Sequence, residues 1–209
     1  MTAISGVEIA LWDIIGKACG QPVYRLLGGR VHQHLPAYAN GWYGGARTPQ
    51  EFAERARDAC QRGYRALKFD PFGVAWKELN PDETEAVVER VAAVRDAVGT
   101  EVSIMIEFHG RLSAGCAVHT IHKLERFQPA WCEEPVTPDS LELLDLVKQQ
   151  VNVPIAAGER LYTLSDFNRL CKWADRTPSI IWKESLERNG AGPLSACTSD
   201  PNVPLLNWM

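Results

Sequence analysis

VSIMIE (residues 102–107), AWCE (130–133) and VPIAAGE (153–159) are three short apolar runs that each end in a glutamate. Each terminal glutamate follows the previous one by 26 residues. This interval fits one strand, one helix and two turns, so the glutamates occupy the same position in successive βα units. The carboxyl ends of the strands of a parallel barrel lie at one face, where active sites are built. The spacing therefore predicts that three carboxylates come together.

Three neighbouring carboxylates repel one another unless a cation lies between them. Oxygen ligands are those that hard divalent cations such as Mg²⁺ prefer. We therefore predict a Mg²⁺ site whose ligands are Glu107, Glu133 and Glu159.

The composition is that of a globular protein with a core. The chain has 209 residues, of which 45% are hydrophobic and 23% charged. A net charge of −4 offers no basic surface for nucleic acid or an anionic membrane. No apolar run approaches the ~20 residues that span a bilayer, and no signal peptide is apparent. The six cysteines are scattered without a CxxC pair, which favours reduced thiols and a cytoplasmic protein.

Strand patterns alternate with helix patterns along most of the chain, which is typical of βαβ units and a parallel sheet. After a helix at 4–18, with Ser5 as a candidate cap, come six predicted strands: 35–41, 64–69, 102–107, 130–133, 153–157 and 180–182. The predicted helices between them are 48–61, 80–98, 115–127, 138–149 and 164–174.

The predicted fold class is α/β, a partial (β/α)8 barrel of the TIM type with about six parallel strands. A closed barrel takes about 250 residues, more than this chain has. We divide the chain into a helical lead-in (1–34) left from the junction with a capping domain, a partial barrel (35–183) and an irregular tail (184–209).

Other polar residues lie at the predicted strand ends. Lys68 and Asp70 are two apart, so both side chains can face the barrel mouth; the alternative is an exposed salt pair. His109 follows Glu107 at the same interval, and an imidazole there can act as acid or base. Adjacent residues face opposite sides of a strand, and equal spacing favours Glu133 over its neighbour as the ligand.

Five segments in order carry a family resemblance: SGVEIALWDIIGKACGQPVYRLLGG (5–29), KFD (68–70), IMIEFHGR (104–111), WCEEP (131–135) and AAGER (156–160). Together they resemble the mandelate racemase/muconate lactonizing group of the enolase superfamily. Within that group, KFD and EFHGR look most like the acid-sugar dehydratases of the galactonate or gluconate type.

The resemblance implies roles for individual residues. The metal ligands would be Glu107, where the group more often has aspartate, then Glu133 and Glu159. His109 would be the general acid on the departing hydroxyl. Lys68 and Asp70 match the site residues of the second strand, while Arg111 and Glu134 would bind substrate.

The implied reaction is that of a carbon–oxygen lyase in sugar-acid catabolism. The proton α to a carboxylate is abstracted to give an enediolate held by Mg²⁺, and the β-hydroxyl leaves as water. The product is a 2-keto-3-deoxy acid. The implied partner is a small-molecule sugar acid, and we expect no nucleic acid or membrane partner.

Departures from the family leave alternatives open. The chain is expected to be a fragment without the capping domain and the last barrel strands, which carry a His–Asp base dyad; no histidine follows His122. Exposed strand edges would then favour a homo-oligomer or other self-association. The alternatives are an inactive remnant that at most binds metal, another racemase or cycloisomerase of the superfamily, and an aldolase-type barrel with Lys68 as its Schiff-base lysine.

Overall fold

The computed structural model describes residues 2–30, 37–137, 140–174 and 180–182. The chain divides into two compact units. The sheet unit is Ala37–Ala156, and the terminal unit combines Met1–Pro36 with Ala157–Met209. The predicted tail (184–209) and residue 183 lie outside the described residues.

Parallel strands form the centre of the sheet unit. β1 (Ala66–Phe69) pairs with β2 (Ser103–Glu107), β2 with β3 (Trp131–Glu133), and β3 with β4 (Ile155–Ala157), always in parallel. Parallel neighbours require crossover connections, which here are helices. The predicted α/β class with a parallel sheet is therefore confirmed.

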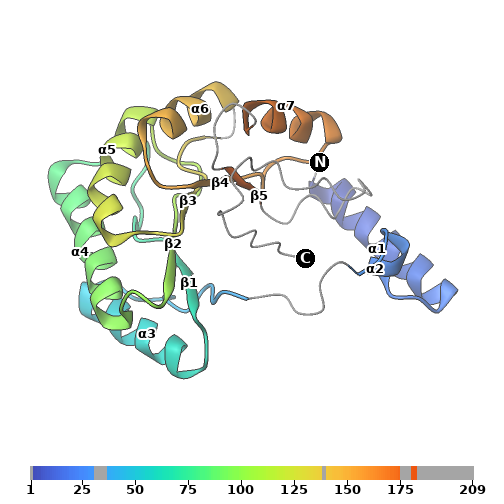
Figure 1. The fold of residues 1–209 in the computed structure, drawn as a ribbon, viewed down its shortest axis with the longest axis horizontal. Coiled ribbons are helices and arrows are strands. Elements are labelled where there is room, and N and C mark those ends of the chain that lie inside the picture. Colours follow the sequence, from blue (N-terminus) through green and yellow to red (C-terminus); the bar gives the residue numbers. More distant parts are fainter. Residues whose placement is uncertain (1, 31–36, 138–139, 175–179, 183–209) are drawn as a thin grey trace. The chain divides into compact units, whose positions relative to one another are not determined.

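Four helices connect or precede these strands: α3 (Pro49–Gln61), α4 (Pro81–Val98), α5 (Ala114–Leu124) and α6 (Leu141–Gln150). A 3-10 helix, η1 (Glu125–Phe127), extends α5. In Figure 1 these helices lie along the outer side of β1, β2 and β3. The strands are thus covered on that side, and Ile104, Met105 and Ile106 are all fully buried, as expected for a parallel sheet packed on both faces.

Local sequence signals set the helix starts. The Thr48 hydroxyl accepts a hydrogen bond from the Glu51 N–H (3.3 Å), and the Glu51 carboxylate accepts one from the Thr48 N–H (2.9 Å). Asn80 and Glu83 form the same reciprocal box at the start of α4. Each box satisfies backbone donors that have no partner within the helix, and the predicted helices 48–61 and 80–98 begin at these two residues.

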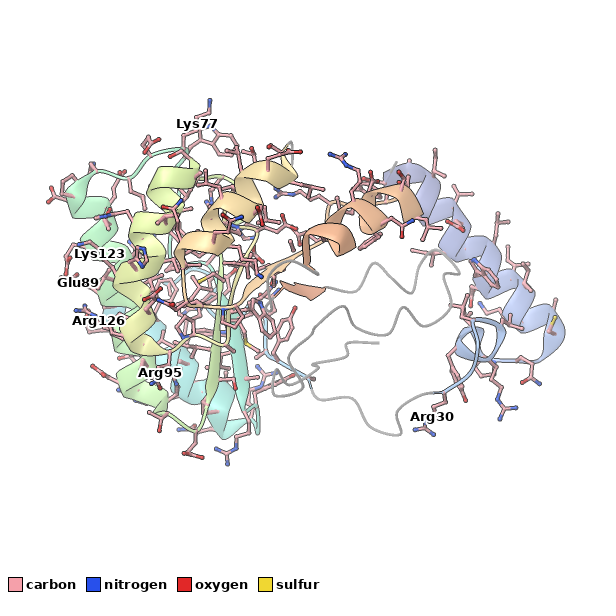
Figure 2. All side chains as sticks on the ribbon, turned by 45° about the horizontal axis from the view of Figure 1, so that its top comes forward. Arg30, Lys77, Glu89, Arg95, Lys123 and Arg126 are labelled. Atoms are coloured by element: carbon pink, nitrogen blue, oxygen red, sulfur yellow. The ribbon has the colours of Figure 1, made fainter. Side chains whose placement is uncertain are left out.

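Arg95 ties the last turn of α4 to the segments that follow it. Its guanidinium donates to the carbonyl oxygens of Phe127 (3.0 Å) and Val102 (2.7 Å), and to those of Gly99 and Gln128. Burial lowers the pKa of Arg95. Figure 2 labels this residue near the lower end of the helices, where α4, η1 and the start of β2 approach one another.

The first predicted strand, 35–41, contributes one parallel bridge within the described residues, between Ala39 and Leu67. Residues 35 and 36 lie outside the described residues. A turn begins at the last residue of this predicted strand, since Gly41 has φ 72° and its carbonyl accepts from the Gly44 N–H (3.1 Å).

The terminal unit contains α1 (Thr2–Cys19), α2 (Val23–Leu26), α7 (Leu164–Ala174) and the short strand β5 (Ile180–Trp182). Since α1 begins at Thr2, Ser5 lies inside the helix and the prediction that it is the cap was wrong. Ile4, Val7, Leu11 and Ile14 on α1 are each more than half exposed. Among the described residues, no helix combines the length and apolarity needed to cross a membrane.

Lys148 on α6 is a buried lysine, 5% exposed, whose Nζ has no hydrogen-bond partner among the described residues. Burial lowers the pKa of Lys148 to about 8. Burying a polar group without a hydrogen bond costs free energy. Lys148 therefore destabilises the folded state when it carries a proton.

We expect Lys148→Met to raise the free energy of unfolding by about 2 kcal/mol at pH 7. An unfolded lysine has a pKa near 10.4, so between about pH 8 and 10.4 only the unfolded state holds this proton. Wild-type stability should rise with pH across this window, and the advantage of the variant should shrink. Urea unfolding followed by tryptophan fluorescence at pH 7 and pH 10 measures both effects.

Lys123→Met is the matched control, because Lys123 lies on the outer face of α5 (Figure 2) and its side chain is 41% exposed. This variant should change stability by less than about 0.5 kcal/mol. A Lys148→Met variant that is less stable than wild type at pH 7 would contradict the prediction.

Candidate metal centre

Two of the three predicted ligands lie side by side in the sheet unit. Glu107 is the last residue of β2 and Glu133 the last of β3, and the two are register partners. Their carboxylate oxygens lie within 4.8 Å of each other. Both side chains are buried, at 2% and 0% exposure. The 26-residue spacing therefore placed these two residues correctly.

A lysine ammonium lies between these carboxylates. Nζ of Lys68, on β1, donates to Glu107 Oε2 at 2.8 Å and to both oxygens of Glu133 at 2.9 Å. Lys68 is 2% exposed. One buried cation therefore holds two buried anions, an arrangement that the sequence did not predict.

Neighbouring donors complete the surroundings of this cluster. The Trp131 indole N–H donates to Glu133 Oε2 at 3.2 Å, and the His109 backbone N–H donates to Glu107 Oε1 at 2.9 Å. The ring of Tyr38 lies 5.5 Å from Nζ of Lys68, within the range of a cation–π contact. Trp131 is two residues before Glu133, so a same-face pattern along the strand could have indicated it.

The electrostatics of the cluster favour additional positive charge. Burial raises the pKa of Glu107, the negative charge of Glu133 raises it further, and Lys68 acts in the opposite direction. Two carboxylates and one ammonium leave a net negative charge. Buried carboxylate oxygens are also the ligand type for a hard divalent cation, and Lys68 shows that a cation is held there. The residues present therefore fit the predicted metal.

Glu159 belongs to the terminal unit. It follows the end of β4 at Ala157 by two residues, across a left-handed Gly158 (φ 121°). Its side chain is 30% exposed, and its Oε1 lies 3.8 Å from Nε of Arg160. Its role as a third ligand stays a prediction.

His109, Asp70 and Arg111 form a second polar cluster in the sheet unit. His109 Nδ1 lies 2.7 Å from Asp70 Oδ2, and Arg111 donates to the same oxygen. The hydrogen bond to Asp70 raises the pKa of His109. Burial, and then the charge of Asp70, raise the pKa of the Tyr43 phenol. The sequence gave no reason to expect Tyr43 near this cluster. Asp70 and Lys68 therefore pair with different partners, and the alternative of an exposed Lys68–Asp70 salt pair is wrong.

Glu134 is 5% exposed and has a left-handed backbone (φ 44°). Its N–H donates to the Ala156 carbonyl at 2.9 Å, and its own carbonyl accepts from the Gly110 N–H at 2.6 Å. These bonds link the ends of β2, β3 and β4. The substrate-binding roles of Glu134 and Arg111 stay predictions.

Comparison with protein families agrees with this geometry. Residues 51–174 match the family described as enolase C-terminal domain-like. This stretch runs from within α3 to the end of α7 and contains the charged residues of both clusters. Residues 1–28 match the N-terminal domain of mandelate racemase/muconate lactonizing enzymes. The chain belongs to the enolase superfamily.

Related enolase-superfamily proteins include named dehydratases. The chain is 44% identical over 165 residues to D-gluconate dehydratase of Thermoproteus tenax, covering 79% of this chain and 33% of that protein. It is 43% identical over 169 residues to D-gluconate/D-galactonate dehydratase of Picrophilus torridus, covering 80% and 43%. The chain thus spans less than half the length of these two relatives.

Solved structures show the same fold. A putative dehydratase from Mesorhizobium loti superposes with a TM-score of 0.75 at 38% identity, covering 78% of this chain and 44% of that one. A putative dehydratase from Zymomonas mobilis gives 0.76 at 32% identity, covering 86% and 49%. The fold predicted from the strand and helix pattern is therefore that of the enolase superfamily.

We expect Lys68→Met to lower the free energy of unfolding by about 3–5 kcal/mol in metal-free buffer. Removing one partner of a buried ion cluster leaves the other charges uncompensated. Urea unfolding in the presence of a chelator measures the loss. Lys123→Met, which removes an exposed ammonium 4.0 Å from Glu85, should change stability by less than about 0.5 kcal/mol. A loss below about 1 kcal/mol for Lys68→Met would mean that the buried cluster does not form in solution.

Proposed function

We propose that this chain carries the metal-binding and general-acid part of a Mg²⁺-dependent acid-sugar dehydratase. The observation that supports it most is the pair of buried carboxylates, Glu107 and Glu133, at the ends of adjacent strands. Relatives named as D-gluconate and D-galactonate dehydratases support the substrate class. The reaction would remove the proton α to a carboxylate and the β-hydroxyl, which gives a 2-keto-3-deoxy acid and water.

Glu107, Glu133 and Glu159 would hold the ion. Ala156 is the register partner of Glu133, and Glu159 follows Ala156 by three residues along the chain. When bound, Mg²⁺ supplies electrostatic stabilisation of the negative charge that develops on the substrate carboxylate. Lys68 adds a positive charge at the same place.

His109 would act as the general acid. Its raised pKa favours a protonated ring near neutral pH, and its side chain is 47% exposed, so a ligand can reach it. The proton passes from the ring to the departing hydroxyl, which leaves as water. No histidine follows His122 in the sequence. We therefore assign no histidine of this chain to the removal of the α-proton.

A second candidate function is metal binding without turnover. The observation that favours it is that no histidine follows His122, so no histidine of this chain is assigned to removal of the α-proton. In this case the superfamily scaffold is retained while catalysis is not. Location in the cytoplasm and self-association stay predictions under both functions.

The aldolase-type alternative has less support. A Schiff-base lysine must attack a carbonyl as a neutral amine. Lys68 instead donates to three carboxylate oxygens and is 2% exposed. Borohydride trapping with a keto acid should therefore give no adduct at Lys68.

Metal binding and product formation, compared between wild type and Glu133→Gln, together separate the two candidate functions. We expect the wild-type chain to bind Mn²⁺, used as a spectroscopic substitute for Mg²⁺ and measured by electron paramagnetic resonance. The variant should bind more than about tenfold more weakly. Glu101→Gln, at an exposed position before β2, is the control and should bind like wild type.

The same proteins are assayed for 2-keto-3-deoxy acid formation from D-gluconate and D-galactonate. Product that is lost in Glu133→Gln supports the dehydratase. Metal binding without product supports the non-catalytic function. Equal Mn²⁺ binding by wild type and Glu133→Gln would contradict both.

A further inference from the structure

Arg111 bridges two segments that leave the sheet at the ends of neighbouring strands. Its Nη2 donates to the Asp70 carboxylate, and its Nη1 donates to the Gly73 carbonyl at 2.9 Å. Both of these acceptors follow β1, whereas the Phe108 carbonyl, which accepts from Nε at 3.0 Å, follows β2. The Arg111 side chain is 12% exposed. One mostly buried guanidinium thus connects the segment after β1 to the segment after β2.

Each of the three nitrogens of the Arg111 guanidinium donates to an acceptor of the chain. Because the group is planar and its donors form a rigid fork, three such bonds fix both its position and its plane. Its central carbon also lies 5.8 Å from the centroid of the Phe72 ring, within the range of a cation–π contact. A lysine ammonium is a compact charge on a flexible stem, so it would not reproduce this set of contacts.

Ring packing and backbone hydrogen bonds join the same two segments. The centroids of the Phe72 and Phe108 rings lie 4.4 Å apart, and these residues are 4% and 0% exposed. Further along the chain, the Lys77 N–H donates to the Arg111 carbonyl at 2.9 Å, and the Lys77 carbonyl accepts from the Ser113 N–H at 2.8 Å. The segment after β1 is therefore attached near its start, at Phe72, and again at Lys77.

The residues between these two attachment points include two exposed apolar side chains. Val74 is fully exposed and Trp76 is 63% exposed, while the small side chain of Ala75 is buried. Exposed side chains gain little from the hydrophobic effect, which follows the apolar area removed from water. The path of this part of the chain therefore depends on polar contacts, and the contact at Gly73 is made by the Arg111 side chain.

Asp70 connects the Arg111 bridge to His109. Its Oδ1 accepts the Phe72 N–H at 2.8 Å, and its Oδ2, which accepts from Arg111, lies 2.7 Å from Nδ1 of His109. The side chain of His109 is 47% exposed and that of Asp70 is 13% exposed. A guanidinium held by the chain thus sets the position of the carboxylate that contacts an accessible side chain.

We propose that Arg111 is a positioning residue that fastens residues 70–77 to residues 108–113 and thereby places Asp70 beside His109. It acts through the geometry of its donor fork and not through its charge alone. This role replaces the predicted contact of Arg111 with substrate. The use of the placed His109 on a departing hydroxyl rests on the proposed function, whereas the fastening of the two segments does not.

The test is amide hydrogen exchange of the full chain in metal-free buffer, followed residue by residue by NMR. The Phe72 N–H is the reporter, because its acceptor is the Asp70 carboxylate. In Arg111→Met its exchange should be about tenfold faster or more than in wild type, since the carboxylate loses a hydrogen bond from a charged group. The Cys132 N–H, which donates from β3 to the Pro154 carbonyl, should exchange at the wild-type rate.

Arg111→Lys separates the donor fork from the charge. If the positive charge alone were needed, the Phe72 N–H of this variant would exchange at the wild-type rate. We expect faster exchange than in wild type, because the ammonium does not reproduce the bonds to the Gly73 and Phe108 carbonyls. Arg57→Met, which removes an exposed guanidinium from α3, is the matched control and should leave the exchange unchanged.

A second measurement reports on residues 70–77 themselves, by ¹⁹F NMR of the full chain labelled with fluorotryptophan. The Trp76 signal is assigned by its loss in Trp76→Phe. In Arg111→Met this signal should shift toward its position in urea. The signal of Trp131, whose indole donates to Glu133, should stay in place. The two signals thus separate a local loss of position from a general loss of stability.

Wild-type exchange at Phe72 in either Arg111 variant, or an unmoved Trp76 signal, would overturn the inference. Faster exchange at Cys132 in both variants would also overturn it, because Arg111 would then act on overall stability. If only Arg111→Met loses protection at Cys132, the result for Arg111→Lys decides. Neither measurement uses a metal or a sugar acid, so failure of this inference is distinguishable from failure of the dehydratase proposal.

Discussion

The buried ammonium of Lys68 is the interaction on which the centre of the sheet unit depends. Two carboxylates at the ends of adjacent strands are brought together by parallel pairing, and burial makes their mutual repulsion costly. Lys68 reaches them from the next strand and offsets that repulsion. The side chains of Trp131 and Tyr38 then close the surroundings of the three charges. Order at the ends of β1, β2 and β3 therefore follows from one cation held between two anions.

The ends of β1 and β2 separate two kinds of chemistry that are close in sequence. Lys68 and Glu107 belong to the buried cluster, whereas Asp70 and His109, each two residues further on, form the accessible one. The second pair lies beyond the strand ends, where the backbone of His109 has already turned into the left-handed region. The same short segments thus supply a buried set of cation ligands and an exposed imidazole with its carboxylate.

Much of the fold could be predicted from local patterns, because caps and apolar periodicity act within a few residues. The predicted helix starts at Thr48 and Asn80 and the predicted strand ends at Glu107 and Glu133 agree with the structure. The partners of Lys68 could not be predicted, since a strand pattern shows which face a side chain takes but not which neighbour it meets. Ser5 is not the cap, because α1 already begins at Thr2. Residues 37–41 form one bridge to β1, through Ala39, because strand pairing depends on distant neighbours that a local pattern does not show.

The left-handed backbone of His109 also limits which residues can replace it over evolutionary time. Outside glycine, the residues that tolerate this conformation best are asparagine, aspartate and histidine, while β-branched residues are strongly disfavoured there. Conformation and chemistry thus restrict the same site independently of each other. Under the proposed general-acid role, a lineage that lost the reaction would be confined at this position to a few small polar residues or glycine. The residue found at position 109 in related sequences would then record whether the proposed reaction has been kept.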